Sequence, residues 1–152
     1  MADWLARLAE LGIELPPVAK PVAAYVPAVQ TGSLVYTSGQ LPFVDGTLTV
    51  SGKVGAAVSA DDAKAAARIC ALNALAAVDG LVGLDAVARI VKVVGFVASA
   101  EGFTGQPGVI NGASEFFGEV FGDAGVHARS AVGVSELPLG APVEVELIVE
   151  VE

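Results

Sequence analysis

The sequence predicts a single α+β domain in which two main helices pack on one face of a mixed β-sheet, preceded by a short helix. Three observations support this fold class. The chain has 152 residues, which is the length of one domain. Hydrophobic residues make up 54% of it, enough for a core that needs no disulfide or structural metal. Helical and β-rich runs follow the order helix, β-hairpin, strand, helix, strand, helix, strand, strand.

The first 22 residues are predicted to form a short helix and an extended connector ahead of the main domain, residues 23–152. Apolar residues recur at helical spacing from Trp4 to Leu11, and Gly12 ends the pattern. Three prolines then favour an extended chain. The first ten residues lack the basic segment and continuous apolar run of a signal peptide, which predicts a cytoplasmic protein.

A β-hairpin is predicted from two β-rich runs, 25–30 and 34–37, with Gly32 in the turn between them. Asp45 and Gly46 indicate a second turn before a short strand at 48–50. The main helix is predicted from 60 to 78, because Ser59 is a suitable N-cap and alanine dominates the run.

The second half of the chain continues with a β-branched strand at 89–97 and a glycine-rich loop at 105–112. A second helix is expected at 113–121, ended by Gly122. The last two strands are predicted at 128–134 and 143–151. Valine and leucine alternate with glutamate in the final strand, so one of its faces is expected to be apolar and the other acidic.

Charge and composition exclude several classes of function. The formal net charge is −9, which disfavours binding to phosphate backbones and so predicts no nucleic-acid partner. One cysteine and one histidine leave too few ligands for a zinc cage, and no metal or other cofactor is expected. No run predicts a membrane span. The mean hydropathy of +0.68 is high for a monomer, which predicts a subunit interface.

Three single residues are candidates for chemistry. Arg129 lies within a strand beside small residues, and two interpretations stay open: a salt bridge to Glu144 or Glu146, or a guanidinium that holds a substrate carboxylate. His127, beside Asp123, is interpreted as a capping or surface residue at a helix-to-strand junction. Cys70 falls on the apolar stripe of the main helix, where it is expected to act as a small hydrophobic residue.

A set of short motifs runs through the main domain. The motifs are Tyr25, Thr37-Ser38-Gly39-Gln40-Leu41-Pro42, Asn111, Ala128-Arg129-Ser130, Leu137-Pro138 and Val143-Glu144-Val145-Glu146. Any one of them alone is weak, but together they are specific. The set resembles the YjgF/Rid proteins, also called L-PSP endoribonucleases, over the chain from about Tyr25 onward.

This resemblance implies a chorismate-mutase-like fold assembled as a homotrimer, with the sheets facing inward and a ligand cleft at each subunit interface. It implies that Arg129 binds the carboxylate of a reactive enamine or imine such as 2-aminoacrylate. It also implies that Glu144 orients the water that hydrolyses this substrate to a 2-keto acid and ammonia. The positions implied to line the pocket are Tyr25, Ser38, Gly39, Asn111 and Ala131.

The sequence departs from the family pattern at three places. Ala131 stands where the family often has cysteine, Gly133 where it often has an acidic residue, and Ala23-Ala24 where it often has Gly-Pro. These departures bear on the substrate more than on the fold. Two alternatives to deamination therefore stay open: a non-catalytic trimer that binds small carboxylates, and the endoribonuclease or translation-inhibitor activity attached to the family name.

Overall fold

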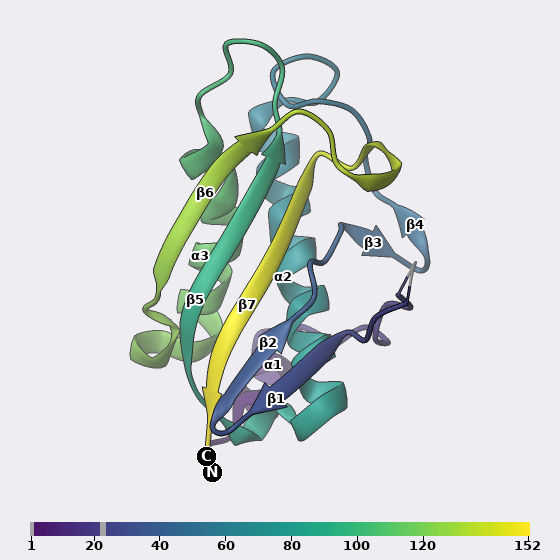
Figure 1. Cartoon of the computed structure of the whole chain (residues 1–152). Coiled ribbons are helices and arrows are strands. Elements are labelled where there is room, and N and C mark those ends of the chain that lie inside the picture. The colour runs from purple at the N-terminus through teal and green to yellow at the C-terminus, as the bar shows by residue number, and fades with distance from the viewer. Residues whose placement is uncertain (1, 22–23) are drawn as a thin grey trace.

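A mixed five-stranded sheet with helices on one face forms the core of the fold (Figure 1). The computed structural model describes residues 2–21 and 24–152. Strand order is β1-β2-β7-β5-β6; β5 and β6 run parallel, and the other neighbours are antiparallel. This arrangement confirms the predicted fold class. The strands are β1 (Ala28–Thr31), β2 (Leu34–Thr37), β5 (Val87–Ala98), β6 (Ala128–Val134) and β7 (Val143–Val151).

Three α-helices accompany the sheet. They are α1 (Trp4–Glu10), α2 (Ala60–Val82) and α3 (Gln106–Phe121). A small separate hairpin, β3 (Phe43–Val44) and β4 (Thr47–Leu48), lies beside α2, and short 3₁₀ turns cover Leu84–Ala86, Gly122–Gly125 and Pro138–Gly140.

Helix α2 forms the centre of the core. The Ser59 hydroxyl accepts a hydrogen bond from the Asp62 amide at 3.1 Å, which is the predicted N-cap. Most of its alanines are buried, as is Cys70, so the helix lies close against the sheet. By length and composition α2 could cross a membrane, but more than half of its apolar window is buried inside the fold, as in the core helix of a soluble protein.

Helix α3 begins earlier than the sequence pattern indicated. The predicted loop at 105–112 was wrong, because helix runs from Gln106 and only Gly105 stays outside it. Pro107 lies in the first turn, where its missing N–H costs no hydrogen bond. A Cβ at Gly112 would overlap the Lys64 carbonyl oxygen of α2, so this glycine lets the two helices approach closely.

Other boundaries differ by a few residues from those expected. The predicted strand at 25–30 begins only at Ala28, and the one at 48–50 is reduced to the end of β4. The predicted limits of β6 and β7 agree with the structure. The proposed domain boundary between residues 22 and 23, and Ala23 of the first loop, lie outside the described residues.

Helices cover one face of the sheet and leave the other face uncovered. Along β7 the apolar residues are buried against the helices, whereas Glu144 and Glu146 are half-buried on the opposite face. The helices lie behind the sheet in Figure 1, and none of the described elements covers its front. We call this front the open face. Its exposed apolar side chains include Val29, Tyr36 and Val132, which are 52%, 39% and 44% exposed.

Candidate functional site

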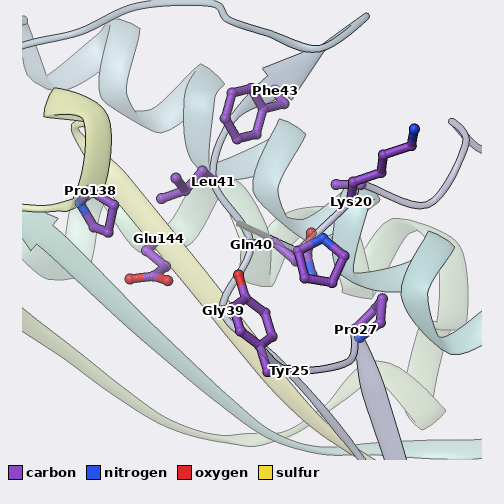
Figure 2. Close-up of a pocket in the computed structure, with 11 residues that line it drawn as sticks. Lys20, Tyr25, Pro27, Gly39, Gln40, Leu41, Phe43, Pro138 and Glu144 are labelled. Atoms are coloured by element: carbon purple, nitrogen blue, oxygen red, sulfur yellow. The ribbon is translucent and has the colours of Figure 1, made fainter. Parts of the chain in front are cut away.

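A small notch beside Glu144 brings together three of the predicted site residues. It lies between the segment before β1, the chain that follows β2 and the start of β7, and has a volume of about 60 Å³. Tyr25, Gly39 and Glu144 all line it (Figure 2). The other lining residues are Ala19, Lys20, Pro21, Pro27, Gln40, Leu41, Phe43 and Pro138.

Ser38 and Gly39 shape this notch in different ways. The Ser38 hydroxyl donates to the Val26 carbonyl oxygen at 2.6 Å, and its amide donates to the Pro27 carbonyl at 2.8 Å. Ser38 therefore fastens the Tyr25 segment to the end of β2 and does not itself line the notch. A Cβ at Gly39 would overlap the Glu144 carboxylate, so a larger residue there would move that carboxylate from its present position.

The Glu144 carboxyl is electrostatically unusual. Burial raises its pKa above the ordinary value, and the neighbouring Glu146 carboxylate raises it further. Burial removes water that would stabilise the charged form, and a like charge nearby acts in the same direction. A carboxyl with a raised pKa keeps its proton to a higher pH than an exposed glutamate does.

Arg129 lies on β6 and extends its guanidinium to α3. Nη1 donates to Asn111 Oδ1 at 2.8 Å and to Ser114 Oγ at 3.2 Å, and Nη2 donates to the Pro107 carbonyl at 3.4 Å. All three acceptors are neutral oxygens. Within residues 2–21 and 24–152, no carboxylate pairs with this guanidinium, so its positive charge is available to an anion.

The structure separates Arg129 from Glu144. Arg129 pairs in register with Val93, a core residue, and thus faces the helices. Glu144 pairs with Phe96 on the open face. The sequence left open a salt bridge from Arg129 to Glu144 or Glu146. The prediction of this salt bridge within one chain is wrong, because the side chain of Arg129 and those of the two glutamates lie on opposite faces of the sheet.

The remaining predicted positions lie on the Arg129 side. Asn111 bonds Arg129 directly, and Ala131 is half-buried against the core two residues further along β6. A Cβ at Gly133 would come within 2.7 Å of Gln106 Nε2, so α3 leaves little room for a larger residue there. One chain thus holds two separate groups: Tyr25, Gly39 and Glu144 at the notch, and Asn111, Arg129 and Ala131 beside α3.

His127 and Ser114 join the Arg129 group, which the sequence reading missed. His127 Nε2 lies 2.9 Å from Ser114 Oγ, and Nδ1 lies 2.6 Å from the Gly125 carbonyl oxygen. His127 is therefore a half-buried residue that caps the 3₁₀ turn ending at Gly125, in line with the capping interpretation, and it also bonds Ser114, which the sequence did not indicate. Only a contact between β6 and α3 reveals this role, and sequence spacing carries no such signal.

Gln40 and Lys20 also line the notch, although the sequence did not predict them as site residues. Gln40 is buried and pairs with Val145 through its backbone, at 2.8 and 3.0 Å, which joins the Gly39 segment to β7. Lys20 belongs to the N-terminal connector, whose position depends on tertiary packing. Cys70 behaves as expected: it is fully buried, and burial raises its thiol pKa well above the ordinary value.

A larger cavity of about 780 Å³ lies between the connector, α2 and the β3–β4 hairpin, and holds none of the predicted site residues. Among residues 2–21 and 24–152, no three histidine, cysteine or acidic side chains gather in a way that could hold a metal ion.

Comparison with known proteins gives consistent matches along nearly the whole chain. The family model described as "YjgF/chorismate mutase-like, putative endoribonuclease" matches residues 5–151, which includes most of the N-terminal helix. Protein TCP17 of Trypanosoma cruzi is 46% identical over 147 residues, covering 95% of this chain and 92% of the relative.

Two further proteins bear on activity and on fold. A 2-iminobutanoate/2-iminopropanoate deaminase of Dermatophagoides farinae is 34% identical over 141 residues, covering 92% of this chain and 95% of its own. The crystal structure of Atu1372 from Agrobacterium tumefaciens, a protein of unknown function, superimposes with a TM-score of 0.90 at 46% identity. That superposition covers 98% of this chain and 92% of Atu1372.

Proposed function

Because the chain belongs to the YjgF/chorismate mutase-like family, we propose that it hydrolyses 2-imino acids, or their enamine tautomers, to 2-keto acids and ammonia. The observation that carries this proposal is the Arg129 guanidinium, a cation that is held by neutral oxygens and, among the described residues, paired with no carboxylate. The relative from Dermatophagoides farinae is named for the same reaction on 2-iminobutanoate and 2-iminopropanoate.

Arg129 binds the substrate carboxylate in this mechanism. A guanidinium carries five N–H groups, and the contacts with Asn111, Ser114 and Pro107 occupy three of them. Among the described residues, the Nε–H and one Nη2–H have no partner. Two N–H groups are what a carboxylate needs for a pair of parallel hydrogen bonds. Such a clamp fixes the substrate relative to the water that attacks it.

Glu144 handles the proton of the attacking water. The water oxygen adds to the protonated imine carbon while one of its protons passes to the Glu144 carboxylate. That proton then moves to the amine nitrogen, which regenerates the Glu144 carboxylate. The C–N bond breaks and ammonia leaves while the remaining hydroxyl proton of the intermediate passes to Glu144, so that the C=O bond of the 2-keto acid forms. The raised pKa of Glu144 supports this exchange, because a group that gives and takes a proton works best when its pKa lies near the working pH.

The complete site is proposed to form between subunits of a homotrimer. Arg129 and Glu144 face opposite sides of one sheet, and the notch of about 60 Å³ is well below the roughly 300–1,000 Å³ of ordinary ligand pockets. If a second chain placed its Arg129 and Asn111 against the Glu144 notch, the two chains together would enclose a larger pocket that contains both groups of residues. The exposed apolar residues of the open face support such an interface.

The experiment compares Arg129→Lys and Arg129→Ala with the wild type. 2-Aminoacrylate is generated in situ, and ammonia release and melting temperature are measured on the same preparations. We expect Arg129→Lys to stay folded yet lose most activity, because an ammonium offers a point contact in place of a planar fork. Arg129→Ala is expected to lose the rest, together with binding of 2-keto acids.

The matched control is Arg68→Lys. Arg68 is an exposed arginine on α2 that pairs with Glu119, and the substitution should leave turnover unchanged. Full activity in Arg129→Lys would contradict the carboxylate clamp. Carboxylate binding without ammonia release in the wild type would favour the non-catalytic alternative. The net charge of −9 weighs against RNA as the substrate.

A further inference from the structure

A continuous chain of hydrogen bonds connects the only histidine of the sequence to Arg129. His127 precedes β6 and reaches Ser114 on α3 at 2.9 Å, and Ser114 Oγ in turn lies 3.2 Å from Arg129 Nη1. His127 Nδ1 lies 2.6 Å from the Gly125 carbonyl oxygen. This series of hydrogen bonds therefore joins four residues: Gly125, His127, Ser114 and Arg129.

The chemistry of the end groups fixes the direction of each bond. A carbonyl oxygen only accepts, so His127 Nδ1 must carry a proton and donate it to Gly125. In a neutral imidazole Nε2 is then the acceptor and takes the Ser114 hydroxyl proton. Arg129 only donates, so Ser114 Oγ accepts from Nη1 with a lone pair that its own donation leaves free.

The histidine ring has a second restraint. Phe117 of α3 contacts it edge-on, with ring centroids 6.1 Å apart and an interplanar angle of 89°. The ring is thus held by the Gly125 carbonyl at one nitrogen and by Phe117 beside it. Because Nε2 is a fixed acceptor, it fixes the direction in which the Ser114 hydroxyl points. A serine hydroxyl without such an acceptor would rotate freely.

We propose that Ser114 and His127 are positioning residues that orient the Arg129 guanidinium for a substrate carboxylate, an inference that rests on the deaminase function proposed above. Asn111 and Ser114 take both hydrogens of Nη1. The plane of the guanidinium is thereby set, and the Nε–H and one Nη2–H are left without a partner among the described residues. Without the His127 acceptor, the Ser114 hydroxyl rotates and Nη1 loses a fixed partner.

The kinetic test uses Ser114→Ala and His127→Phe, the latter retaining a ring against Phe117. Both variants are expected to raise KM for 2-iminopropanoate about 3- to 10-fold, the effect of one lost hydrogen bond, with kcat near the wild-type value. His127→Gln, which restores an acceptor near the Nε2 position, is expected to return KM to within about twofold of wild type.

The matched control is Ser99→Ala. Ser99 is also half-buried and bonds Val97 and Gln106, but it does not touch Arg129. We expect it to lower the melting temperature as Ser114→Ala does while leaving KM unchanged. A KM shift equal to that of Ser114→Ala would mean that loss of stability, and not orientation of Arg129, causes the effect. Unchanged KM in His127→Phe would overturn the proposal.

Two further measurements separate this inference from the proposed function. The ¹⁵N signals of the single histidine report its tautomer directly, and an Nε2–H form would overturn the hydrogen-bond chain whatever the activity. The Kd for pyruvate measures carboxylate binding without turnover. If the wild type binds pyruvate but releases no ammonia, deamination fails while weaker pyruvate binding by Ser114→Ala still supports positioning. If the wild type binds no pyruvate, both proposals are overturned.

Discussion

The position of the Glu144 carboxylate depends on the residue opposite it, Gly39. A Cβ at position 39 would displace that carboxylate, and Ser38 anchors the neighbouring segment that carries Tyr25. The glutamate is consequently held in a half-buried place where water is scarce and Glu146 is close. Both effects raise its pKa, so the geometry of one glycine is linked to the acidity of the proposed catalytic group.

The raised pKa of Glu144 makes stability depend on pH in a defined direction. Between the ordinary pKa of the unfolded chain and the raised pKa of the folded one, the folded protein binds a proton that the unfolded chain does not. The free energy of unfolding contributed by this group therefore falls as pH rises through that window, and stays lower above it. Glutamine cannot ionise, so Glu144→Gln should escape this loss.

We expect Glu144→Gln to gain stability relative to wild type on going from pH 4 to pH 7.5, measured by urea denaturation, and to lose turnover by about 10²- to 10⁴-fold. The control is Glu146→Gln, which removes a neighbouring carboxylate from the same strand and should retain turnover. Equal losses of turnover in both variants would show that Glu144 was the wrong choice.

Some residue roles follow from local pattern and others do not. Tyr25, Gly39 and Glu144 stand in recognisable motifs, and the structure places them around one notch. Ser114 and His127 are separated by a helix end and a turn, and their contact exists only because β6 packs beside α3. A sequence pattern describes neighbours along the chain, so it cannot predict which polar groups meet between packed elements.

At the scale of elements, strands were predicted more accurately than the start of α3. Alternation along β6 and β7 reflects which face is buried, and this pattern persists to the ends of both strands. In α3, the low helix propensity of glycine led to the prediction of a loop. Packing against α2 overrides that propensity, because Gly112 permits a contact that no larger residue allows.

Two glycines of the same helix test this explanation. Gly112→Ala should destabilise the protein by about 1–3 kcal/mol, because the added methyl group forces α2 and α3 apart. Gly118→Ala meets nothing within 4 Å and should stabilise the protein by up to about 1 kcal/mol, the difference in helix propensity. Denaturant unfolding measures both. Equal effects would mean that Gly112 does not determine the helix packing.

At the scale of the whole molecule, part of the high apolar content of the sequence is exposed on the open face of the sheet. Tyr36 and Ile148 are neighbours in register on this face, as are Phe96 and Val132, and no described element covers them. The sequence predicted a subunit interface from its hydropathy, but it could not show that Arg129 and Glu144 face apart. That separation is a property of sheet pairing, so a site that uses both residues needs a second chain, which the proposed trimer would supply.

If each site takes Arg129 from one subunit and Glu144 from the next, two inactive variants should restore each other's activity. Random co-assembly of Arg129→Ala and Glu144→Gln chains makes about three quarters of trimers mixed, each with one intact site of three. Ammonia release should therefore reach about a quarter of the wild-type rate, in particles that light scattering measures at three times 15.2 kDa.

The control for this experiment is co-assembly of wild-type chains with chains that carry both substitutions. A site shared between neighbours needs two adjacent wild-type chains, so activity should again be about a quarter of the full rate. A site contained in one chain would give about a half in this control and none from the two single variants. Because both mixtures contain the same number of each substitution, their ratio depends only on whether the site lies within a chain or between chains.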